Sequence, residues 1–103
     1  MAAVPEYRRF ADFYPFYLSE HRNRTCRRLH FAGATLALIC LALLVWTRNP
    51  WWLLAGFVCG YAFAWVGHMG FEKNRPATFK YPFYSFAGDW VMYAQIWRGE
   101  IRF

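Results

Sequence analysis

Three histidines and a glutamate are the side chains in this 103-residue sequence with the clearest capacity for chemistry. His30 opens a long apolar run, His68 lies near the end of a second one, and His21 precedes both. Glu72 follows His68 by four residues, a spacing that puts both side chains on one face of a helix. Two imidazoles and a carboxylate suit non-haem Fe(II) and leave positions open for dioxygen and substrate, and a third histidine could replace the carboxylate. The alternative is that the imidazoles only anchor the chain at a membrane surface.

Two apolar runs must position these histidines. Residues 29–46 and 51–71 each contain one ionisable side chain, the histidine named above. A helix over the first run would measure roughly 27 Å, close to the thickness of a hydrocarbon core. Only residues 47–50, which read TRNP, separate the runs, so the two spans must form an antiparallel hairpin. The hairpin therefore predicts that His30 and His68 lie side by side at one membrane face.

His21 can join this pair only if the chain bends. It lies nine residues before His30, so on one straight helix the two side chains would face opposite ways. We expect the bend at residues 23–25. The sequence predicts that residues 14–28, which include this bend, form an interfacial helix or a helix followed by a turn.

The segment after the second span, residues 83–103, is amphipathic and contains Asp89. This pattern favours an interfacial or re-entrant helix over a third span. Asp89 could cap that helix or accept a hydrogen bond from a histidine of the site, and we favour the second role. With 58% hydrophobic and 23% aromatic residues, the chain is too apolar for one small soluble core. The sequence predicts one all-α domain over residues 1–103, a small integral membrane protein with a two-span hairpin and amphipathic helices on either side of it.

The formal net charge of +6 could bind either nucleic acid or anionic lipid headgroups, and the positions of the basic residues favour lipid. Basic residues flank the hairpin: Arg8, Arg9, Arg22, Arg24, Arg27 and Arg28 before it, and Lys73, Arg75 and Lys80 after it. The turn carries only Arg48. By the positive-inside rule, we expect both termini and the histidines on the cytoplasmic face and no nucleic-acid partner.

Other signatures are weak or missing. Cys26, Cys40 and Cys59 are an odd number without a close pair, which argues against a disulfide framework or a zinc finger. The sequence contains no phosphate-binding glycine loop, HExxH or GxSxG motif. Gly56 and Gly60 form a GxxxG pair through which two copies could associate.

Two segments, residues 17–33 and 65–77, carry a pattern that resembles a known family. The pattern consists of His21 with Asn23 nearby, His30 before Gly33, Gly67-His68 with Glu72 four residues on, and Pro76-Ala77. It resembles the family of the fungal endoplasmic-reticulum 2-hydroxy fatty acid dioxygenase and its short bacterial relatives, over nearly the whole chain. Cys26 is a departure, because we expect asparagine there in many relatives.

The resemblance implies an Fe(II)-dependent dioxygenase that oxidises 2-hydroxy fatty acids with O2 and removes one carbon. Carried over, His21, His30 and His68 would hold the iron, and Glu72 would be a further ligand or a polar partner. The acyl tail of the substrate would lie between the spans, with its head at the depth of the histidines. Its carboxylate would be held by Arg24, Arg27 or Arg28. The protein would sit in a bacterial inner membrane or the endoplasmic reticulum.

Two other functions fit the same residues. A non-enzymatic membrane protein could bind lipid or a partner and use the histidines as interfacial anchors. A proton or metal-ion carrier would need an oligomer, for example through Gly56 and Gly60, because two spans are too few for a pore.

Overall fold

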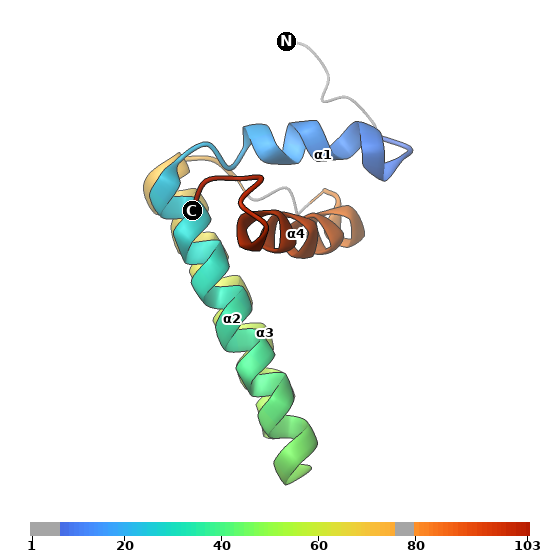
Figure 1. Ribbon diagram of the computed structural model, residues 1–103, viewed down its shortest axis with the longest axis vertical. Helices are drawn as coiled ribbons and strands as arrows, with labels where there is room; N and C mark the ends of the chain where they lie inside the picture. Colours follow the sequence, from blue (N-terminus) through green and yellow to red (C-terminus); the bar gives the residue numbers. More distant parts are fainter. Residues whose placement is uncertain (1–6, 76–79) are drawn as a thin grey trace.

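The computed structural model describes residues 7–75 and 80–103, and these are arranged entirely as helices and connecting loops. The elements are α1 (Phe10–Ser19), α2 (Arg24–Thr47), α3 (Trp51–Val66), the π-helix η1 (Gly67–Glu72) and α4 (Pro82–Trp97). Helices α2 and α3 form a long antiparallel hairpin, and α1 and α4 lie across one end of it (Figure 1). The predicted all-α architecture is confirmed. Pro76-Ala77, part of the pattern noted in the sequence, falls outside the described residues.

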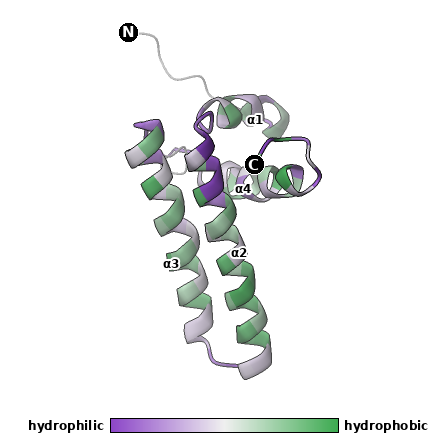
Figure 2. Ribbon diagram, turned by 60° about the vertical axis from the view of Figure 1, so that its left-hand side comes forward, coloured by the Kyte–Doolittle hydropathy of each residue, from purple (hydrophilic) through white to green (hydrophobic). Residues whose placement is uncertain are grey.

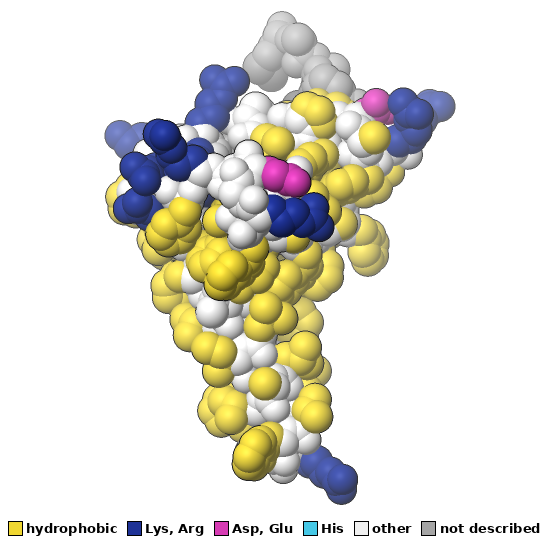
Figure 3. Space-filling model, viewed as in Figure 1, with side chains coloured by type: hydrophobic (Ala, Val, Ile, Leu, Met, Phe, Trp, Pro, Cys, Tyr) yellow, Lys and Arg dark blue, Asp and Glu magenta, His cyan; other side chains and the backbone are white. Residues whose placement is uncertain are grey.

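The hairpin has the length and surface of a membrane segment. Two stretches, Arg24–Thr47 and Trp51–Glu72, are long and apolar enough to cross a membrane. Most of their large apolar side chains are exposed, as the space-filling view shows along the hairpin (Figure 3). Hydrophilic residues gather instead where the hairpin meets α1 and α4 (Figure 2). An apolar surface of this extent is typical of contact with lipid rather than water.

Helix α2 begins five residues before the apolar run, at Arg24, because Asn23 caps it. The Asn23 side chain accepts hydrogen bonds from the backbone N–H groups of Thr25 (2.9 Å) and Cys26 (3.2 Å). The bend between His21 and the first span therefore exists but precedes α2. Its predicted position, residues 23–25, is right for Asn23, which lies in the bend, and wrong for Arg24 and Thr25, which already belong to the helix.

Small residues let the two arms of the hairpin approach closely. A Cβ on Gly33 would lie only 2.9 Å from the Cβ of Phe63, and one on Gly56 would lie 3.3 Å from the Cβ of Cys40. Gly56 thus already packs within the chain, whereas nothing lies within 4 Å of a Cβ added to Gly60. A contact between copies through Gly56 would have to replace this intramolecular one, so association through the glycine pair stays a prediction.

Helices α1 and α4 share an aromatic core beside the hairpin. Phe13 and Tyr17 of α1 are buried against Met92 and Ile96 of α4. With 16 residues, α4 is shorter than the roughly 20 that a membrane span needs. The expectation of an amphipathic helix in place of a third span is therefore confirmed.

Candidate metal centre

The three histidines meet where the hairpin joins α1. His21 lies in the loop between α1 and α2, His30 in α2, and His68 in η1. One ligand nitrogen from each lies within 4.8 Å of the others. The ring centroids are 4.5 to 5.0 Å apart, and the ring planes stand nearly perpendicular to one another. The side chains are almost closed to solvent, at 2, 8 and 3% exposure.

The hydrogen bonds of the rings decide which nitrogen is available. Each Nδ1 has an oxygen partner: Tyr17 O for His21 (2.6 Å), Cys26 O for His30 (2.9 Å) and Asn74 Oδ1 for His68 (2.7 Å). Carbonyl oxygens only accept, so each Nδ1 carries the hydrogen and each neutral ring keeps a bare lone pair on Nε2. The three Nε2 atoms are thus the free ligands of the cluster.

Two of these Nε2 atoms lie too close for neutral rings alone. The Nε2 atoms of His21 and His30 are 3.1 Å apart. Two facing lone pairs repel at this distance unless a cation lies between them. Adjacent imidazole ligands at about 2.1 Å from one metal ion would lie roughly 3.0–3.4 Å apart. The spacing of this pair therefore fits two ligands of one divalent metal ion, and the His68 ring lies close enough to supply the third.

Burial keeps the His21 ring uncharged. It lowers the pKa of His21 well below its usual value, and a proton on the neighbouring His30 or His68 would lower this pKa further. A neutral imidazole is the form that binds a metal ion. The loop that carries His21 therefore presents it in the ligand state at neutral pH.

Glu72 lies close to the site but has a structural partner. Its Oε1 accepts a hydrogen bond from the backbone N–H of Asn23, the residue that caps α2. The carboxylate is not among the groups whose ligand atoms converge within the described residues, which are the three histidines. The geometry supports three imidazoles over two imidazoles and a carboxylate, and a catalytic part for Glu72 stays a prediction.

Asp89 lies in the middle of α4, so the alternative that it caps this helix is wrong. The hydroxyl of Tyr17 donates a hydrogen bond to Asp89, and the Tyr17 ring stacks on His21 with centroids 4.1 Å apart. Asp89 therefore reaches the histidines through Tyr17 rather than by the direct hydrogen bond that we expected. Burial raises the pKa of Asp89 to about 7, and the hydrogen bond from Tyr17 opposes this shift. Burial and Asp89 also raise the pKa of Tyr17 well above its usual value.

The three arginines predicted to hold a substrate carboxylate contact the segment after α4. Arg24 Nε donates to the backbone oxygen of Phe103 (2.7 Å), and Arg27 Nε donates to that of Arg102 (3.1 Å). The Arg28 guanidinium lies 5.0 Å from the centre of the Phe103 ring. A role for Arg24, Arg27 and Arg28 in substrate binding stays a prediction.

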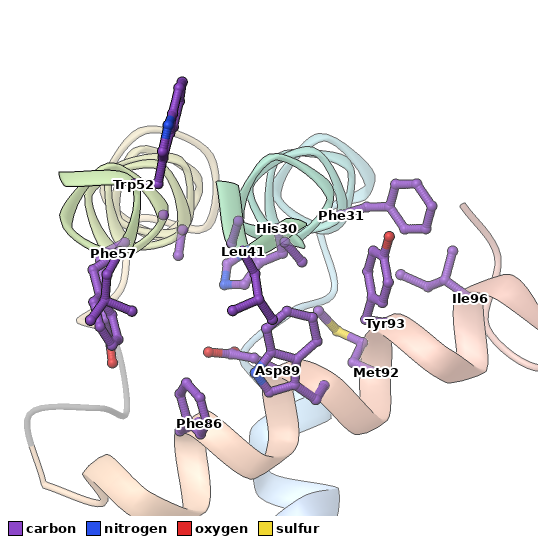
Figure 4. A pocket seen from close by; sticks show the side chains of 18 residues that line it. His30, Phe31, Leu41, Trp52, Phe57, Phe86, Asp89, Met92, Tyr93 and Ile96 are labelled. Carbon is purple, nitrogen blue, oxygen red and sulfur yellow. The ribbon is translucent and has the colours of Figure 1, made fainter. Parts of the chain in front are cut away.

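An apolar cavity of about 190 Å³ opens between α2, α3 and α4. His30 and Asp89 provide its polar end, and both side chains point into the space between the three helices (Figure 4). From His30 to Leu41 the cavity follows α2 for roughly 16 Å. Small residues of the two spans leave this space open: Ala34, Ala37, Gly56, Gly60 and Ala64.

The sequence reading missed three contributors to the site. Tyr17 links Asp89 to His21, and Asn74 and Glu20 stand behind His68. Asn74 lies within the segment 65–77 but was not one of the residues of the family pattern. Cys26, the expected departure from that pattern, has its sulfur 3.7 Å from His30 Nδ1.

Comparison with known proteins gives one match. A family model described as "2-hydroxy-palmitic acid dioxygenase Mpo1-like" matches residues 7–101. No curated protein and no solved structure matches the chain. The matched region contains all three histidines and every helix of the structure.

Proposed function

Because the chain belongs to the Mpo1-like family of 2-hydroxy-palmitic acid dioxygenases, we propose that it is an Fe(II)-dependent membrane dioxygenase that shortens 2-hydroxy fatty acids by one carbon. The family match bears out the resemblance noted in the sequence. One observation carries the proposal: three buried imidazoles turn bare Nε2 atoms toward one point, beside the polar end of an apolar cavity.

The cavity supports an acyl substrate. Its lining is apolar along α2 and α3, and its polar groups gather at the end next to the histidines. A fatty acid tail would lie between the spans, where both the protein and the surrounding lipid are apolar. Its hydroxy-acid head would then reach His30 and Asp89, and no charged group would have to enter the hydrocarbon region.

Iron(II) held by the three imidazoles would supply the electrons that activate dioxygen. In the overall reaction, a 2-hydroxy acid and O2 give the acid one carbon shorter, carbon dioxide and water. The Nδ1 hydrogen bonds hold each ring in one orientation. The buried core of α1 and α4 includes Tyr17, whose ring stacks on His21, and so shields that side of the site from water. Asp89, whose pKa is about 7, can take up a proton from the substrate head at a carboxyl oxygen.

The charge distribution supports an orientation in the membrane. The basic residues gather at the end of the hairpin that carries α1 and α4, and Arg48 lies at the other end. By the positive-inside rule, the histidine site and both termini would face the cytoplasm, in a bacterial inner membrane or the endoplasmic reticulum.

The direct test is turnover of 2-hydroxypalmitate by protein purified in detergent and supplied with Fe(II) under air. We expect one O2 consumed for each acid one carbon shorter, and no consumption of palmitate, which lacks the hydroxyl. His68→Ala should abolish turnover, whereas Asn49→Leu, at the far end of the hairpin, should not. Full activity of His68→Ala together with absence of iron would instead support the non-enzymatic lipid-binding alternative.

A further inference from the structure

His68 differs from the other two histidines in what holds its ring. The Nδ1 atoms of His21 and His30 donate to backbone carbonyls four residues earlier, which no substitution can remove. The Nδ1 of His68 donates instead to a side chain, Asn74 Oδ1, at 2.7 Å. The orientation of this one ligand therefore depends on the identity of another residue.

The end of η1 places Asn74 over His68. Lys73 adopts a left-handed conformation, with φ of 57°, and this reverses the chain after the π-helix. The backbone N–H of Asn74 then donates to the carbonyl of His68 at 3.0 Å. Asn74 thus contacts His68 twice, through its backbone and through its amide oxygen.

Glu20 determines which way the Asn74 amide points. The Asn74 Nδ2 donates to the Glu20 carboxylate at 2.7 Å and to the Glu20 backbone oxygen at 3.2 Å. With both oxygens on the nitrogen side, the amide oxygen must face His68. Glu20 also directly precedes His21, so the same hydrogen bonds connect the loop that carries one ligand to the helix end that carries another.

We propose that Glu20 and Asn74 are positioning residues that fix the tautomer of His68 and strengthen its Nε2 as a metal ligand. The carboxylate makes a charge-assisted hydrogen bond to the amide, which polarises the amide oxygen and makes it a better acceptor for the Nδ1 hydrogen. An imidazole that donates to such an acceptor is a stronger ligand, and loss of a partner of this kind typically weakens metal binding 10–100-fold. The inference rests on the proposed metal site.

We call the hydrogen bonds that join Glu20, Asn74 and His68 the relay. Cobalt(II) titration of the purified protein in detergent tests it. In Asn74→Leu, the buried Nδ1–H loses its acceptor, so we expect cobalt affinity to fall about 10–100-fold. ¹⁵N NMR of labelled histidine should also show that His68 no longer occupies a single tautomer. In Glu20→Gln, the new amide oxygen still accepts from Asn74 but without charge, so the loss should be only a few-fold. Asn49→Leu is the matched control, because it removes an asparagine that accepts from Trp51 N at the far end of the hairpin; its cobalt affinity should equal that of the wild type.

Exchanging the amide of Asn74 with the carboxylate of Glu20 distinguishes a positioning role from simple packing. Asn74→Asp alone sets two carboxylates against each other and should weaken both folding and cobalt binding. The double variant Asn74→Asp/Glu20→Gln restores the side-chain donor and acceptor, with the negative charge now next to His68, although the hydrogen bond to the backbone oxygen of residue 20 is lost. It should therefore bind cobalt more tightly than Asn74→Asp alone. Unchanged affinity and tautomer in Asn74→Leu, or no recovery in the double variant, would overturn the relay. If His68→Ala binds cobalt as tightly as the wild type, the metal site itself is wrong; if it loses cobalt while Asn74→Leu does not, only the relay is wrong.

Discussion

Replacement of Asp89 by asparagine should remove one component of the pH dependence of stability, the loss of stability as the pH rises from about 4 to about 7. Asp89 is a half-buried residue of α4 that contacts Tyr17 of α1 and lines the cavity, and burial raises its pKa from 3.8 to about 7. A folded-state pKa above the unfolded value means that the carboxyl favours folding most at low pH. This contribution is complete below about pH 4 and is lost as the pH rises through about 7.

The magnitude follows from the shift. About three pKa units at 1.36 kcal/mol each give a loss of about 4 kcal/mol between pH 4 and pH 7, as an upper estimate. Other groups facing Asp89 do not mimic this change. Tyr17 stays protonated over the whole range because its pKa is raised. His30 lies at the same end of the cavity as Asp89 in both proteins, so its contribution cancels from the difference between them. The lowered pKa of His21 has the opposite sign, because it costs stability as the pH falls below about 6.5.

The measurement is urea unfolding of wild type and Asp89→Asn in a mild detergent at several pH values, followed by tryptophan fluorescence. Asparagine keeps the acceptor for the Tyr17 hydroxyl, so the difference between the two proteins isolates the titration of Asp89. We expect the wild type to lose stability relative to the variant by about 1.4 kcal/mol per pH unit from about pH 4 to pH 7, and no further above that. A difference that stays constant with pH would show that the carboxyl is not buried as described.

Three other substitutions test the cavity and the hairpin. Gly60→Phe should fill the cavity and raise KM for long 2-hydroxy acids more than for short ones. Gly70→Phe is the control, because Gly70 is equally open but does not line the cavity, and it should leave the chain-length preference unchanged. Equal KM changes for all chain lengths would contradict the placement of the tail. Gly33→Ala should cost about 1–3 kcal/mol in a thermal or denaturant unfolding assay, because its Cβ would meet that of Phe63 at 2.9 Å, and a neutral effect would mean that the arms lie farther apart.

The hairpin and two of its histidines follow from the sequence with few assumptions. The four residues 47–50 are too short for anything but an antiparallel return, so His30 and His68 had to meet. The capping role of Asn23 was also within reach, because asparagine is a favoured residue before a helix. It was missed because the helix was expected to begin with the apolar run at residue 29, whereas α2 begins at Arg24 and includes the polar residues Arg27 and Arg28.

The remaining features depend on contacts between distant segments. The hydrogen bond from Tyr17 to Asp89 joins residues 72 positions apart, and that from Asn74 to Glu20 joins residues 54 apart. The left-handed turn at Lys73, after the π-helix, brings Asn74 to His68 Nδ1, whereas Glu72 accepts from the backbone of Asn23. The cavity exists only because α4 lies across the hairpin, which no periodicity in residues 83–103 specifies.

The central claim is that His21, His30 and His68 form one metal site. It is tested most directly by the metal content of protein purified anaerobically in detergent and loaded with Fe(II), compared with the three single His→Ala variants. The wild type should retain about one iron per chain after desalting, and each variant should retain far less while keeping its helical circular dichroism. Folded variants that hold as much iron as the wild type, or a wild type that holds none, would contradict the account.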